Sequence, residues 1–88
     1  MPTISSFYGI VIRMHWLERD HPPPHFHAIY GDQRAVINIE TLEEMEGRLP
    51  RRAKVHVLEW ADEHRAELLE NWELCAKKQQ PKKIPPLE

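Results

Sequence analysis

The segment from Tyr8 to Trp16 alternates between apolar and polar positions. Apolar side chains fill its even positions, whereas the odd positions include Arg13 and His15. An alternation with a period of two, rich in β-branched and aromatic residues, is typical of a strand with one buried face. We therefore predict a first strand over residues 8–16. Leu17–Pro24 follows as a connector, because its three consecutive prolines cannot pair in a sheet.

Two further strands are predicted at His25–Tyr30 and Gln33–Glu40, joined by a turn at Gly31 and Asp32. Glycine in the first turn position favours a two-residue hairpin of type II′, which would pair Tyr30 with Gln33. This register gathers apolar residues on one face: Phe26, Ala28, Tyr30, Ala35, Ile37 and Ile39. The opposite face receives His25, His27, Ile29, Arg34, Val36, Asn38 and Glu40. The separation of the two sets supports the register.

Helical periodicity follows from Pro50, a plausible first helical residue, to Ala76. Apolar and small residues recur there at spacings of three and four: Ala53, Val57, Ala61, His64, Leu68, Trp72 and Cys75. One continuous helix and two helices divided near His64 are both compatible with this pattern. Residues 41–49 are predicted to be a polar loop, in which a short extra strand before Pro50 remains an alternative. The tail, residues 77–88, holds four lysines and three prolines and is expected to be mobile or draped on the surface.

Strands followed by helix predict an α+β fold. We expect a three-stranded antiparallel β-meander packed on one face by a C-terminal helical segment, in the order β-β-β-α or β-β-β-α-α. A chain of 88 residues suits one domain, which we place at residues 1–76. The second face of the sheet is then left open to water or to a partner.

Composition narrows the classes of function. The net charge of −2 gives no general attraction to nucleic acid or membrane, so such binding requires a local patch. The single cysteine, Cys75, cannot form an intrachain disulfide. The sequence contains neither a signal-peptide pattern nor an apolar stretch of the roughly 20 residues that a membrane helix needs. We therefore expect a cytoplasmic protein without membrane association.

The sequence His25-Phe26-His27 is the sharpest local signal in the chain. Residues two apart on a strand point the same way, so both imidazoles should emerge on the open face. If they bind zinc or another transition metal, a third ligand must come from His15, His21 or Glu40. Of these, His15 and Glu40 share the parity of the open face.

Acid–base chemistry is an alternative for the same two histidines. A neutral and a protonated imidazole beside Arg13 and Arg34 would suit attack on a phosphodiester without a metal. The third interpretation is that His25 and His27 are half-buried surface groups bonded to their neighbours. The pattern alone does not choose among the three.

A basic cluster lies at the junction between the loop and the helix and comprises Arg48, Arg51, Arg52 and Lys54. It could hold phosphates or a partner, with Asn38 as a further contact, or it could be a solvated flank. Aromatic residues are not interleaved among these cations, so the sequence does not predict a platform for stacking bases.

Several short motifs occur in order along nearly the whole chain: Pro2-Thr3-Ile4-Ser5, Tyr8-Gly9-Ile10, Pro23-Pro24-His25-Phe26-His27-Ala28, Glu46-Gly47-Arg48-Leu49-Pro50, Leu58-Glu59-Trp60-Ala61, Glu67-Leu68-Leu69-Glu70-Asn71-Trp72 and Ile84-Pro85-Pro86-Leu87. Together they resemble the prokaryotic family known as domain of unknown function 4160. The resemblance implies an arrangement like a bacterial type II toxin–antitoxin pair. The toxin-like chain would be encoded beside a small protein of the 2442 group, and no catalytic residues are implied.

Three functions follow as hypotheses. The first is a toxin-like effector that acts on RNA or on translation and is silenced by a small cognate antitoxin-like protein. Its candidate catalytic residues are His25, His27, Arg13 and Arg34. The second is a non-catalytic module that binds protein or nucleic acid. The third is a small zinc-binding domain built on His25, His27 and His15.

Overall fold

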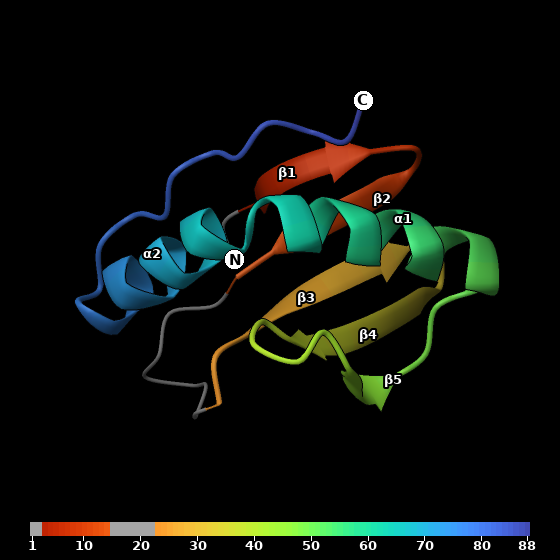
Figure 1. Ribbon diagram of the computed structural model, residues 1–88, viewed down its shortest axis with the longest axis horizontal. Coiled ribbons are helices and arrows are strands. Elements are labelled where there is room, and N and C mark those ends of the chain that lie inside the picture. The colour runs from red at the N-terminus through yellow and green to blue at the C-terminus, as the bar shows by residue number, and fades with distance from the viewer. Residues whose placement is uncertain (1–2, 15–22) are drawn as a thin grey trace.

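The computed structural model describes residues 3–14 and 23–88 and shows an α+β fold, as predicted. A five-stranded antiparallel sheet has the strand order β1-β2-β3-β4-β5. Its strands are β1 (Thr3–Phe7), β2 (Ile10–Arg13), β3 (His25–Tyr30), β4 (Gln33–Asn38) and β5 (Glu44–Gly47). Two helices follow, α1 (Arg51–Glu63) and α2 (Arg65–Ala76). Helix α1 crosses one face of the sheet, and α2 continues beyond the sheet (Figure 1).

The prediction of three strands was wrong at both edges of the sheet. At the first edge, Tyr8 and Gly9 form a turn with positive φ angles of 49° and 79°, which divides the expected first strand. Residues on either side pair with each other, for example Phe7 with Ile10. Tyrosine rarely adopts a positive φ and is common in strands, so the sequence did not indicate a turn at this position. The remainder of that prediction, residues 15–16, lies outside the described residues.

At the second edge, residues 44–47 form β5, so the alternative of a short strand before Pro50 was the correct one. The strand pairs Val36 with Glu46 and Ile37 with Glu44, and an irregularity in register separates the two pairs. Three of its four residues are glutamate or glycine, which are depleted in strands. Intrinsic preference therefore gave little sign of it.

The predicted hairpin is confirmed residue by residue. Tyr30 pairs with Gln33, His27 with Val36 and His25 with Asn38. At the turn, Gly31 has a positive φ of 59° and Asp32 does not, as a type II′ turn requires.

The helical region is divided at His64, where the backbone φ is −116°. Pro50 precedes α1 as its N-cap residue and is not its first helical residue. The predicted stripe faces the sheet, because Ala53, Val57 and Leu68 are buried in the same core as Phe26 and Ile37. Within the described residues, neither helix is long and apolar enough to cross a membrane.

The C-terminal segment, residues 77–88, folds back over α2, α1 and β1, as Figure 1 shows. Its Ile84 and Leu87 are buried in the core. The indole nitrogen of Trp60 donates to the Pro85 carbonyl at 2.8 Å. The backbone N–H of Ile84 donates to the Ile4 carbonyl on the outer strand β1, also at 2.8 Å. The segment therefore covers part of an edge strand that could otherwise pair with another chain.

Asn71 anchors the middle of this segment. Its side chain, 1% exposed, donates to the Lys82 carbonyl and accepts from the Lys82 N–H, at 2.9 and 2.8 Å. The ammonium of Lys82 also contacts Glu70, whose hydrogen bond and negative charge raise the pKa of Lys82.

Candidate functional site

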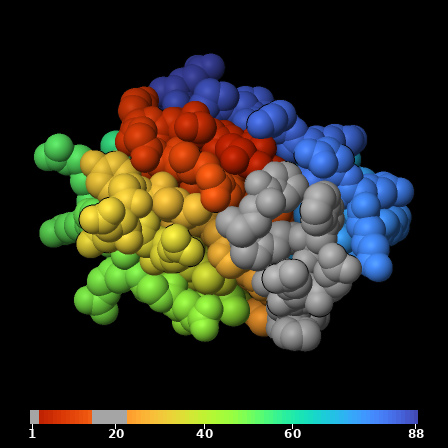
Figure 2. All heavy atoms as spheres, turned by 180° about the vertical axis from the view of Figure 1, so that it is seen from behind, coloured from red at the N-terminus to blue at the C-terminus, as the bar shows by residue number. Residues whose placement is uncertain are grey.

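The face of the sheet opposite α1 is not covered by either helix. Figure 2 views the molecule from this side, with the strands toward the viewer. On this face the register places Arg13 beside His27, and Val11 beside Ile29. Ile29 in turn lies beside Arg34. The face thus combines half-buried aliphatic side chains with cationic ones.

A hollow of about 390 Å³ opens on this face between β3, β4 and β5. Its lining comprises His27, Ile29, Arg34, Ala35, Val36, Glu46 and Gly47. An imidazole, a guanidinium and a carboxylate, each from a different strand, therefore border one space.

The relative positions of these groups follow from the register. His27 pairs with Val36 and Val36 pairs with Glu46, so His27 and Glu46 occupy one row on the same face. Two strand spacings place their α-carbons about 10 Å apart. That separation leaves room for a group of phosphodiester size between the two side chains. Arg34 lies in the neighbouring row.

His25 lies beside His27 on this face, with 5.4 Å between ring centroids, as strand parity predicts. Its expected exposure was wrong, because the residue is only 6% exposed. Its Nδ1 donates to the Pro23 carbonyl at 2.9 Å, and its ring lies 5.0 Å from that of Trp72 on α2. A buried ring held in this way supports its neighbour and gives a substrate little access.

A three-ligand metal centre is not complete within residues 3–14 and 23–88. Groups of three or more histidine, cysteine, aspartate or glutamate side chains suited to a metal are absent there. Glu40 therefore does not complete a set with His25 and His27. His15 and His21, the other proposed third ligands, lie outside the described residues.

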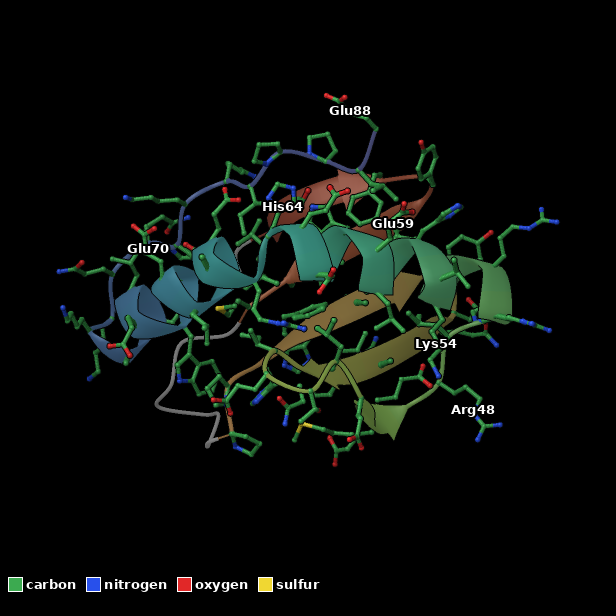
Figure 3. All side chains as sticks on the ribbon, viewed as in Figure 1. Arg48, Lys54, Glu59, His64, Glu70 and Glu88 are labelled. Atoms are coloured by element: carbon green, nitrogen blue, oxygen red, sulfur yellow. The ribbon has the colours of Figure 1, made fainter. Side chains whose placement is uncertain are left out.

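The basic cluster divides into bound and exposed members. Lys54 contacts Glu44 at 3.2 Å, and the same carboxylate accepts from the Leu49 N–H at 3.0 Å, so Lys54 helps to join α1 to β5. Arg48, Arg51 and Arg52 are exposed. Figure 3 shows Arg48 pointing away from the body of the protein.

Asn38 has a local structural role. Its side-chain oxygen accepts from the backbone N–H groups of Glu40 and Thr41, at 2.7 and 3.0 Å. These bonds hold the chain reversal between β4 and β5. Asn38 therefore has little remaining capacity as an acceptor for a ligand.

Fold and site together define a small α+β domain whose five-stranded sheet is covered on one face and carries, on the other, a hollow lined by both aliphatic and charged side chains. The family model described as "Domain of unknown function (DUF4160)" matches residues 9–73, and the chain belongs to this family. Comparisons with curated proteins and with solved structures give no match.

Sequence reasoning missed Glu46 as a site residue. The carboxylate enters the hollow only because residues 44–47 form a strand, and they were predicted to lie in a loop. The available signal was the alternation Glu44-Met45-Glu46. A regular strand would place both glutamates on one face. The irregularity in register between β4 and β5 places them on opposite faces instead.

Proposed function

We propose that this protein is the toxin-like member of a bacterial type II toxin–antitoxin module and that it acts on RNA at the open sheet face. Its partner would be a small protein of the 2442 group, as the family resemblance implies. One observation carries the proposal: His27, Arg34 and Glu46 border a single hollow on a face that neither α1 nor α2 covers.

These three groups suit RNA transesterification without a metal. Glu46 accepts the proton of the ribose 2′-hydroxyl, whose oxygen attacks phosphorus. The bond from phosphorus to the 5′-oxygen breaks, and protonated His27 supplies the proton to that leaving oxygen from Nδ1, because Nε2 of the same ring is buried. The products are a 2′,3′-cyclic phosphate and a free 5′-hydroxyl. Arg34 binds the phosphate as its charge develops.

The neighbouring residues support this chemistry. Arg13 lies beside His27 and supplies a second cation for the phosphate backbone. His25 packs between Trp72 and His27 and limits the movement of the catalytic ring. The pair of histidines considered from the sequence is thus replaced by one histidine and one glutamate.

The test is cleavage of a single-stranded RNA by the purified protein, together with growth of cells that express it without its partner. His27→Gln and Glu46→Gln are each expected to lower the cleavage rate by about a hundredfold and to relieve growth arrest. Glu43→Gln is the matched control, because Glu43 is exposed and outside the lining of the hollow. Thermal melts establish that each variant is folded.

Cleavage that persists unchanged in both folded variants would overturn the proposed catalysis. A second candidate function, a non-catalytic surface for the antitoxin-like partner, is favoured by the half-buried Val11, Ile29 and Val36 on the same face. Aliphatic groups of this kind form the centre of protein interfaces more readily than they bind phosphates.

For this second function, Ile29→Asp is expected to weaken binding of the partner at least tenfold, because it places a carboxylate in an apolar contact. Titration calorimetry with the neighbouring gene product measures the effect, and Glu43→Gln again serves as control. Unchanged affinity in Ile29→Asp would remove the open face as the partner's binding surface.

A further inference from the structure

Three chain reversals meet at one end of the sheet: the turn at Tyr8 and Gly9, the turn at Gly31 and Asp32, and the junction from β5 into α1. The antiparallel order of the strands requires this, and Figure 1 shows all three at the right of the view. This end brings together side chains that are far apart in the sequence.

Two tyrosines are exposed here. Tyr8 is 56% exposed and Tyr30 is 39% exposed. The ring of Tyr8 lies 4.8 Å from that of His56 on α1, measured between centroids. Tyr30 lies against Gly9, where an added Cβ would come within 3.4 Å of its ring. Each ring is thus held on one side and available on the other.

The backbone of Tyr8 adds a second indication. A φ of 49° is unfavourable for a residue with a side chain, and asparagine or glycine is the usual occupant of such a turn position. Local strain of this kind persists mainly where function requires it. Here the strained residue carries a large aromatic ring and is more than half exposed.

Exposed cations lie at the same end of the sheet, at the junction of β5 and α1. Arg51 and Arg52 are exposed at the start of α1, and Arg52 is one turn from His56 on the same side of the helix. Arg48 is exposed beside them, and its N–H donates to the Arg34 carbonyl at 3.1 Å. The side chain of Arg34 lines the hollow, so this basic surface adjoins the proposed catalytic site.

We propose that this aromatic–basic end, formed by Tyr8, Tyr30, His56, Arg48, Arg51 and Arg52, binds single-stranded RNA and leads it to the hollow. Unpaired bases stack on the two tyrosines, and the arginines contact the phosphates between them. Flat exposed rings beside cations suit a strand with unstacked bases, because a duplex keeps its bases inside. The inference rests on the proposed function, which identifies the nucleic acid as RNA. It adds the surface that binds the RNA strand.

The experiment measures binding of a fluorescein-labelled 12-nucleotide single-stranded RNA by anisotropy. Tyr8→Asn is the informative variant, since an Asn-Gly pair favours the same turn and should preserve the fold. Tyr8→Asn and Tyr30→Thr are each expected to weaken binding about tenfold. Val55→Ala is the control, because Val55 is as exposed as Tyr8 but offers neither a ring nor a charge.

Salt dependence tests the cations separately. Each lost phosphate contact should lower the slope of log K against log salt by about 0.7 for a single strand. The double variant Arg51→Gln/Arg52→Gln is therefore expected to lower that slope by about 1.4. Unchanged slope in the folded double variant would contradict contact between these arginines and phosphate.

The experiments distinguish a failure of the proposed RNA binding from a failure of the proposed catalysis. If Glu46→Gln and the wild type both bind RNA and neither cleaves it, the proposed catalysis fails and the binding surface stands. If the protein cleaves RNA but neither tyrosine substitution changes its affinity for RNA, the inference is overturned. Equal affinity for a duplex of the same length, or for polyglutamate, would overturn it as well.

Discussion

Replacing Trp60 with alanine is expected to lower the free energy of unfolding by about 3–5 kcal/mol. Among the residues that the structure describes, the indole of Trp60 is the largest fully buried side chain, at 0% exposure. Its ring centroid lies 5.4 Å from that of Phe7 on β1 and 5.9 Å from that of Phe26 on β3. Trp60 therefore joins α1 to two separate strands, and its removal leaves a cavity that neither layer can close.

For a chain of this length, that loss is a large part of the total stability, which is about 4–13 kcal/mol. The melting temperature should fall by more than about 12 °C. Urea unfolding followed by circular dichroism measures the free energy of unfolding, and a thermal melt measures the melting temperature. A loss below about 1 kcal/mol would show that the two layers do not depend on this contact.

Trp60→Phe is the matched variant. It keeps an aromatic ring in the core but loses the hydrogen bond from the indole nitrogen to the Pro85 carbonyl. We expect a loss of about 1–3 kcal/mol from the unsatisfied carbonyl and the smaller ring. Because the bond holds the C-terminal segment, amide exchange should accelerate at Ile84, whose N–H bonds to β1. Comparison of Trp60→Ala with Trp60→Phe thus separates the contribution of ring packing from that of the hydrogen bond to the C-terminal segment.

The parts of the fold that were predicted correctly follow from signals between residues close together in the sequence. The hairpin register followed from alternation and from the turn at Gly31, and the helix stripe followed from spacings of three and four. The missed strands depend on information that alternation does not carry. Tyr8 adopts a turn conformation that its side chain disfavours, and β5 consists mostly of glutamate and glycine, which are depleted in strands.

The sequence predicted which face of the sheet carries the candidate site, but it did not predict which side chains line the hollow. Strand parity placed His27 and Arg34 on the open side, and the structure brings both to one hollow. The burial of His25 depends on Trp72, which is 47 positions away along the chain and meets it only in the folded state. The entry of Glu46 and the exposure of Tyr8 likewise depend on tertiary structure. Contacts distant in sequence therefore decide which of the candidate side chains a substrate can reach.

Gly47→Ala is expected to lower the free energy of unfolding by about 2–5 kcal/mol and to displace β5 from β4. The residue has a positive φ of 71°, and an added Cβ would lie 2.2 Å from the Arg34 carbonyl oxygen. That neighbour is backbone within the sheet, so it cannot rotate away as a side chain could. A left-handed conformation costs an alanine about 1–2 kcal/mol, and relief of the overlap adds about 1–3 kcal/mol.

Gly31→Ala separates these two contributions. Gly31 also has a positive φ, of 59°, but an added Cβ would meet nothing within 4 Å. Its substitution should therefore cost only the conformational part, about 1–2 kcal/mol. Urea titrations of the two variants give the difference, and equal losses would contradict a clash at Gly47. Since Glu46 and Arg48 flank Gly47, displacement of β5 should also reduce the proposed RNA cleavage by the folded fraction of this variant, whereas Gly31→Ala should retain it.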